Sequence, residues 1–333
     1  MKRFGISLLI LVIIFIFTGS ASLAQMKYVS ISTGSTGGTF YPAGAIIAST
    51  FNEYLGDSGY KWSAQASGGS LENLEMLRNK EAQMAIVGSA PSNWAYTGSQ
   101  DFEGKAIKNI RYMTALWPEM TQIIYRKGIG IEGWKDLKGK KVAVGPAGGS
   151  YFYSRIILKA TAGLTFDDII PEYMSYGDSV QALQDRLIDA AYLAAGIPTS
   201  AVSQAYAGRV EIDILEFSDE ELARLHEAAP FYVRGVIEKD TYPGQDRDLQ
   251  VAANPSALLV EQDMPEDIVY SMLDAMYLKG LEEMKKQHHS LTFLSLEGAI
   301  EGLSGAPLHA GAVKFYKDHG INIPGDLIPP EMK

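Results

Sequence analysis

Short apolar strands that end in loops of glycine, serine and threonine constrain the fold of this chain most strongly. The first such loop lies within Ile31–Tyr41 (ISTGSTGGTFY) and the second within Gly145–Tyr151 (GPAGGSY). Both follow an apolar segment predicted as a strand and precede a segment with the apolar spacing of a helix. Similar loops, at 67–70 and 88–89, follow strands predicted over 60–66 and 84–87. In an open α/β sheet such loops meet at the carboxyl ends of the strands, where ligands bind.

The loops also have the chemistry of an anion site. Backbone N–H groups and small hydroxyls converge in such a loop, and the N-terminus of the following helix adds positive potential. A single loop of this kind is often only a tight turn between a strand and a helix. Because the loop recurs at equivalent strand ends, the pattern predicts a captured anionic ligand rather than a catalysed reaction.

The order of the predicted elements indicates two domains. Segments 110–116 and 121–125 are predicted strands on either side of Trp117-Pro118-Glu119, which we interpret as a crossover into a second domain. The chain is predicted to return to the first domain after about residue 232. The expected lobes are therefore 25–117 together with 235–333, and 118–234.

Most carboxylates lie in surface or helix-start positions, where they complement the helix dipole. Glu119 differs because it lies at the crossover, between Pro118 and Met120. For this residue a hinge or pocket role is an alternative to a surface role. The longest amphipathic helix is predicted over Pro265–Met284, and its methionines are interpreted as core packing.

The N-terminus has the three parts of a secretory signal peptide. Lys2 and Arg3 precede an apolar run over residues 6–17, and small residues follow up to Ala24. This run is shorter than the roughly 20 residues that a membrane span needs. We therefore predict cleavage near Ala24 and a periplasmic protein. Removing residues 1–24 of the 333 leaves 309 residues, enough for two domains.

Composition and motifs exclude several function classes. A formal net charge of −10 argues against nucleic acid or anionic lipid as a partner, and the lack of cysteine excludes thiol chemistry. The loops fit neither a nucleophile elbow, because Thr33 stands two residues before Ser35, nor a P-loop, because Thr39-Phe40 follow Gly38. The five histidines form no metal-ligand pattern. We expect no enzyme activity, no cofactor and no metal.

The chain strongly resembles the solute-binding subunits of TRAP transporters of the TAXI class. The resemblance covers nearly the whole mature chain and rests on ISTGSTGGTFYPAG (31–44), ASGGSLENLEML (66–77), DLKGKKVAVGPAGGS (136–150) and TYPGQD (241–246). It implies a type II periplasmic binding protein fold, in which two α/β lobes joined by a hinge close on a small carboxylate, such as a dicarboxylate or glutamate. It also implies a monomer that delivers this ligand to TRAP membrane permease subunits.

Carried over by position, the resemblance also implies the ligand contacts. The first lobe would contribute a loop with the site residues Ser35, Thr36, Gly38, Thr39 and Tyr41, and a second loop with Ser67, Gly69 and Ser70. The second lobe would contribute Gly148, Gly149, Ser150 and Tyr151. Two further strand ends add Ser89 and Gly196 to the candidate ligand-binding residues.

One departure from the family bears on the ligand. Many relatives carry a Gln-Ser-Asp type of sequence after the third strand, whereas this chain reads Gly88-Ser89-Ala90-Pro91. The loss of a carboxylate removes a partner for a ligand ammonium group, so we expect an acid without an amine. Two alternatives stay open: a binding protein that serves a sensor kinase or an ABC importer, and an exported serine hydrolase that uses Ser35 or Ser150.

Overall fold

The computed structural model describes residues 26–333 of the chain. The predicted signal peptide, residues 1–24, lies outside the described residues. Within the described part, none of the helices combines the length and the apolar character that crossing a membrane requires.

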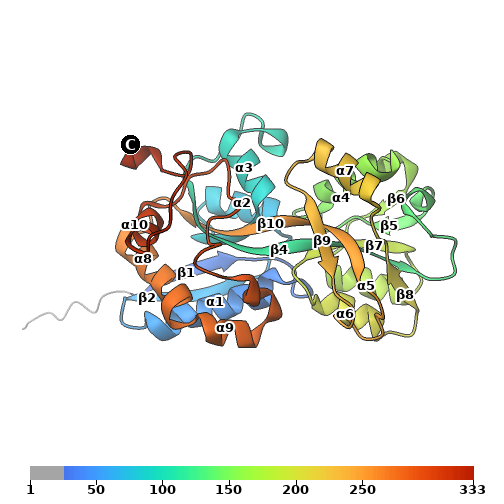
Figure 1. The fold of residues 1–333 in the computed structure, drawn as a ribbon, viewed down its shortest axis with the longest axis horizontal. Helices are drawn as coiled ribbons and strands as arrows, with labels where there is room; N and C mark the ends of the chain where they lie inside the picture. The colour runs from blue at the N-terminus through green and yellow to red at the C-terminus, as the bar shows by residue number, and fades with distance from the viewer. Residues whose placement is uncertain (1–25) are drawn as a thin grey trace, which may run out of the picture.

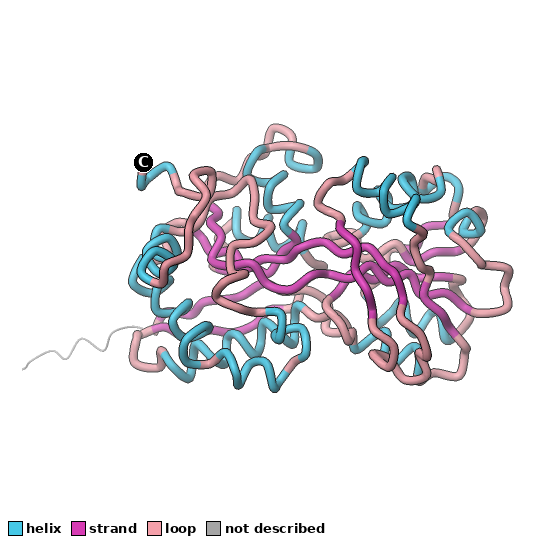
Figure 2. Tube along the Cα trace, viewed as in Figure 1, coloured by secondary structure: helices cyan, strands magenta, loops and turns pink. Residues whose placement is uncertain are grey.

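The described chain alternates strands and helices (Figure 1). The strands are β1 Lys27–Ser32, β2 Tyr60–Gln65, β3 Met84–Gly88, β4 Ile110–Arg126, β5 Lys141–Ala143, β6 Ile170–Glu172, β7 Ala190–Ala195, β8 Ile212–Ile214, β9 Val233–Ile237 and β10 Leu249–Glu261. The α-helices are α1 Phe40–Tyr54, α2 Ser70–Arg78, α3 Ser89–Thr97, α4 Tyr151–Ala162, α5 Tyr176–Gln184, α6 Ser200–Tyr206, α7 Asp219–Ala228, α8 Glu266–Asp274, α9 Leu281–Gln287 and α10 Ala310–Asp318. Helices flank the strands in both halves of the molecule (Figure 2).

The strands form one continuous hydrogen-bonded sheet in the order β2-β1-β3-β10-β4-β7-β5-β6, with β8 paired to β4 and β9 to β10. Strands β1, β2 and β3 run parallel to one another in the first lobe, and β5, β6 and β7 do so in the second. The predicted architecture of two α/β lobes is therefore confirmed.

Two long antiparallel strands, β4 and β10, connect the lobes (Figure 1). One half of each strand pairs inside the first lobe, and the other half pairs with β7, β8 or β9 in the second. Pro118 lies opposite Pro255 midway along this pair, and a register irregularity follows Pro255. Because proline has no N–H to donate, the ladder is weakest at this point. We therefore propose this point as the hinge between the lobes.

Two separate hydrophobic clusters pack against the sheet. One contains buried residues of 29–117 and 257–327, and the other contains buried residues of 120–253. Only the short segments 118–119 and 254–256 lie between them in sequence. We therefore propose that the chain returns to the first lobe near Asn254, since residues 237–253, which the sequence reading places in the first lobe, pack in the second cluster.

Two elements differ from the sequence prediction. The predicted strands over 110–116 and 121–125 form one strand, β4, because Trp117-Pro118-Glu119 continues the extended backbone. The helix predicted over Pro265–Met284 is divided into α8 and α9 by a π turn at Ala275–Lys279. The turn ends at Gly280, where a Cβ would lie 2.6 Å from the Thr50 side chain of α1. This close packing against α1 accounts for the glycine.

Candidate functional site

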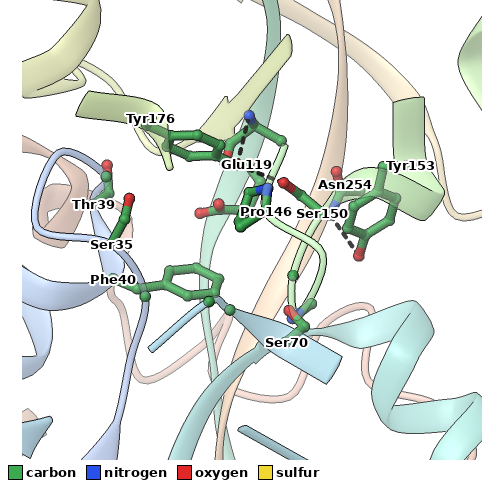
Figure 3. A pocket seen from close by; sticks show the side chains of 17 residues that line it. Ser35, Thr39, Phe40, Ser70, Glu119, Pro146, Ser150, Tyr153, Tyr176 and Asn254 are labelled. Atoms are coloured by element: carbon green, nitrogen blue, oxygen red, sulfur yellow. Dashed lines mark hydrogen bonds between the residues drawn. The ribbon is translucent and has the colours of Figure 1, made fainter. Parts of the chain in front are cut away.

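A cavity lies between the two lobes, at the carboxyl ends of the parallel strands (Figure 3). The centre of a water-sized sphere can occupy about 50 Å³ of it. This space suits a ligand the size of a small organic acid. Seventeen residues line it, and they come from both lobes and from both connecting strands.

The N-termini of five helices converge on the cavity. Each of α1, α2, α3, α4 and α5 contributes its first residue, its N-cap residue or both to the lining: Thr39, Phe40, Gly69, Ser70, Gly88, Ser150 and Tyr176. A helix N-terminus presents free N–H groups and carries roughly half a positive charge. We therefore expect these helix ends to favour an anion, although no Lys, Arg or His stands among the 17 lining residues.

Hydroxyl groups add further hydrogen-bonding capacity around these helix ends. The Ser70 hydroxyl accepts a hydrogen bond from the Gly88 N–H at 3.0 Å, so its own proton is free to be donated. The Ser150 hydroxyl is hydrogen-bonded to the Tyr176 hydroxyl at 3.2 Å. Neither Thr39 nor Ser150 caps its own helix with a side-chain hydrogen bond. The free N–H groups of α1 and α4 are therefore open to a ligand.

Two buried polar side chains on the connecting strands form another part of the cavity wall. Glu119 on β4 and Asn254 on β10 are direct cross-strand partners, and both line the cavity (Figure 3). Glu119 is 5% exposed and its Oε1 accepts a hydrogen bond from the Trp117 indole N–H at 2.6 Å. Burial raises the pKa of Glu119 to about 8, although the bonds from Trp117 and from the Gly196 backbone lower it.

Two tyrosines from the second lobe complete the wall. Tyr176 donates to the Ala194 carbonyl at 2.9 Å and accepts from the Ala194 N–H at 3.0 Å, so its position is fixed at the end of β7. Burial raises the pKa of Tyr176 to about 12. Burial also holds the pKa of Tyr153 well above its usual range. Both phenols are therefore protonated near neutral pH.

The structure brings half of the predicted site residues to the cavity. Those that line it are Ser35, Gly38, Thr39, Gly69, Ser70, Gly149 and Ser150. Those that do not are Thr36, Tyr41, Ser67, Ser89, Gly148, Tyr151 and Gly196. Several of the latter support their neighbours: the Ser67 hydroxyl donates to Asn73 Oδ1 at 2.6 Å, and the Gly196 carbonyl accepts from the Thr39 hydroxyl at 2.6 Å.

The sequence reading missed the other lining residues: Gly34, Phe40, Gly68, Gly88, Pro146, Tyr153, Tyr176, Ala194 and Asn254, with Glu119 recognised only as an alternative. One signal was available for Asn254. Asn254-Pro255 interrupts the apolar run of 251–260 just as Pro118-Glu119 interrupts that of 110–125. Polar residues beside a proline in an otherwise buried strand indicate a special position.

Glycine-to-glycine contact closes the cavity between the lobes. The Gly68–Gly69 loop of the first lobe packs on the Gly148–Gly149 loop of the second, and we call this contact the glycine clasp. The Glu72 N–H donates across the clasp to the Gly148 carbonyl at 2.8 Å. A Cβ on Gly149 would overlap the Gly68 carbonyl oxygen. A second hydrogen bond between the lobes runs from the Ala201 N–H to the Gly37 carbonyl at 3.1 Å. The structure therefore has its lobes closed.

The raised pKa of Glu119 predicts a pH-dependent cost to the ligand-free fold. Below about pH 4.5, both folded and unfolded states carry the proton and no cost arises. Between about pH 4.5 and 8 the unfolded state releases the proton while the folded state keeps it, so stability falls by up to about 1.4 kcal/mol per pH unit. Glu119→Gln removes this loss. In urea unfolding of the ligand-free proteins, the free energy of unfolding of the variant should increase relative to that of the parent as the pH rises through this window. A difference that does not change with pH would contradict the prediction.

The comparisons with known proteins agree with this architecture. MatC from Rhodopseudomonas palustris with bound malate is 15% identical with a TM-score of 0.53, over 82% of this chain and 89% of that one. A ligand-binding component of an ABC-type import system from Staphylococcus aureus, with zinc bound, is 12% identical with a TM-score of 0.51, over 92% and 97%. A protein described as a periplasmic transporter is 14% identical with a TM-score of 0.51, over 88% and 92%. At these identities the likeness shows a shared fold, that of periplasmic binding proteins.

The sequence profile of the NMT1-like family matches residues 31–320, which include both connecting strands and every cavity-lining residue. Since this match covers most of the 333 residues, the chain belongs to the NMT1-like family.

Proposed function

We propose that this chain is an extracytoplasmic solute-binding protein that captures a small carboxylate between its lobes and delivers it to a membrane importer. The observation that carries the proposal is the convergence of five helix N-termini, from both lobes, on one closed cavity without a cationic side chain. This arrangement binds an anion through N–H groups and hydroxyls. Both halves of the site come from one chain, which supports the expectation of a monomer.

Hinge closure is the proposed mechanism. Ligand first contacts the helix N-termini of one lobe, and the second lobe then rotates about the proline pair Pro118 and Pro255. Closure forms the glycine clasp and removes water from the cavity. Charge-assisted hydrogen bonds to the ligand strengthen as the local dielectric constant falls. The closed form is then the state that a membrane importer would recognise.

The serine hydrolase alternative gains no support from the cavity. A nucleophilic serine needs a base within hydrogen-bonding reach. The Ser150 hydroxyl is hydrogen-bonded to Tyr176, whose phenol, with a pKa of about 12, is not a base near neutral pH. None of the 17 lining residues is a histidine. We therefore propose a binding protein without enzyme activity.

The membrane partner is supported by two different observations. The loop sequences at 31–44 and 136–150 resemble the TAXI class, which favours TRAP permease subunits. The comparisons support no TRAP partner, and one of the similar structures is a component of an ABC-type import system. An ABC importer is therefore the second candidate, and among the comparisons it is the better supported one. The predicted signal peptide supports a periplasmic location for either.

A thermal-shift screen over small carboxylic and amino acids tests the proposed function. The protein is unfolded and refolded first, so that bound ligand is removed. At about 100 times its Kd, a true ligand should stabilise the fold by about 2.7 kcal/mol because it binds only the folded state. Calorimetry on each hit then gives the affinity. A flat screen of the refolded protein would count against the binding function.

The glycine clasp gives a second prediction. Gly149→Ala should weaken ligand binding by about tenfold or more, because its Cβ holds the lobes apart and each tenfold corresponds to about 1.4 kcal/mol. The melting temperature of the ligand-free variant should stay near that of the parent. Small-angle X-ray scattering should show the parent, but not the variant, contracting when ligand is added.

Gly177→Ala is the matched control for this experiment. Gly177 lies on the same lobe, at the start of α5, and a Cβ there has nothing within 4 Å. This control should contract and bind as the parent does. If Gly149→Ala also contracted fully on ligand addition, the clasp would not be part of closure.

A further inference from the structure

Glu119 and Asn254 present hydrogen-bond acceptors to the cavity. They stand opposite each other on β4 and β10, at the point where the two strands pass between the lobes. Their exposed fractions are 5% and 1%, so bulk water does not satisfy them. Figure 3 shows both side chains at the cavity, with Asn254 beside Tyr153.

The hydrogen bonds of this pair leave acceptors unused. Asn254 Nδ2 donates to the Tyr153 hydroxyl at 3.4 Å, whereas Asn254 Oδ1 has no partner among the described residues. Glu119 Oε1 accepts a hydrogen bond from Trp117, and within residues 26–333 the Gly196 backbone is a second hydrogen-bond partner of this carboxyl. A buried acceptor without a donor is costly. The unused Asn254 oxygen therefore marks a place for a donor that the ligand brings.

The charge of the cavity indicates which donor this is. Glu119 is the one carboxylate among the 17 lining residues, and these include no Lys, Arg or His. A ligand that carries only carboxylates brings no donor for the unused Asn254 oxygen, and it leaves Glu119 in its protonated form. A ligand with an ammonium group brings three N–H donors for Asn254 Oδ1 and Glu119, and its positive charge stabilises the ionised form of Glu119.

We propose that Glu119 and Asn254 form a subsite for the protonated amine of the ligand, while the helix N-termini hold its carboxylate. The ligand class is then a zwitterionic amino acid. This inference rests on the proposed function and specifies its substrate class. It replaces the expectation of an amine-free acid, because Glu119 supplies the carboxylate that Gly88-Ser89-Ala90-Pro91 lacks.

Proton exchange on binding follows from the same subsite. The groups that face Glu119 are Trp117 and the Gly196 backbone, the hydroxyls of Tyr153 and Tyr176, and Asn254. Both tyrosines titrate far above neutral pH, so Glu119 is the group that changes state. With its pKa near 8 it holds a proton at neutral pH, and an ammonium group lowers that pKa. Binding of an amino acid should therefore release close to one proton per ligand at about pH 7.

Matched acids that differ at one carbon test the proposal on refolded mature protein. Each set contains the amino, hydroxy, keto and unsubstituted acid of one skeleton: aspartate, malate, oxaloacetate and succinate; glutamate, 2-hydroxyglutarate, 2-oxoglutarate and glutarate; alanine, lactate, pyruvate and propionate. Calorimetry in two buffers of different ionisation enthalpy gives affinity and proton release together. In the skeleton that binds, we expect the amino acid to bind at least about tenfold more tightly than its analogues.

The possible outcomes separate this inference from the proposed function. Equal or tighter binding of an amine-free acid, without proton release, overturns the amine subsite and leaves the binding function standing. Failure of every acid to bind counts against the binding function itself. Tighter binding of the amino acid with proton release supports both.

Variants locate the effect. Glu119→Gln keeps the shape of the side chain but removes its charge, so it should abolish proton release and reduce the preference for the amino acid by about tenfold or more. Glu261→Gln is the control, because Glu261 lies at the far end of β10, half buried and outside the cavity. The control should retain both preference and proton release. Unchanged preference in a folded Glu119→Gln variant, checked by its melting curve, would also overturn the proposal.

Discussion

The pairing of β4 with β10 is the constraint on which the rest of the structure depends. These two strands run through both lobes, and their register places Pro118 opposite Pro255 and Glu119 opposite Asn254. In the proposed closure, the same few residues therefore serve as the hinge and as part of the cavity wall. Any rotation at the prolines changes the position of both lobes relative to the Glu119–Asn254 pair. Closure and ligand contact are thus coupled through the covalent chain itself.

The proposed binding of an anion takes place against an unfavourable electrostatic background. The whole chain carries a formal charge of −10, and the cavity has no cationic side chain among its lining residues. In the proposed function, the dipoles of five helix ends supply local positive potential, which falls off within about one helix turn. Recognition by such short-range donors requires close contact from several directions. A two-lobed clamp provides that contact, whereas a single lobe presents only part of the donor set.

The sequence predicts those features that depend on local pattern. The loops at 31–41 and 145–151 follow strands and begin helices as expected, because glycine-rich turns and apolar spacing are local signals. The position of Asn254 in the cavity could not be read in the same way. It depends on the pairing of β10 with a strand about 135 residues away in sequence, and hydrophobic periodicity carries no information on such register. The π turn at Ala275–Lys279 ends at Gly280, which packs against Thr50 of α1, and this contact between distant parts of the chain has no local sequence signal either.

The glycine clasp has a consequence for how such a protein diversifies. Its contacts are made by the main chain of Gly68, Gly69, Gly148 and Gly149 and do not involve the side chains that distinguish one ligand from another. Gly68, Gly69 and Gly149 also line the cavity, but only with main-chain atoms, so the side chains that would select the ligand belong to other residues. Substitutions in the side chains of the cavity wall can therefore change which ligand binds, while the clasp contacts of the closed form stay the same. Variants with a changed cavity wall could then serve as sensors for other ligands. Two fluorescent labels placed on either side of the clasp would detect closure in the same way for each of them.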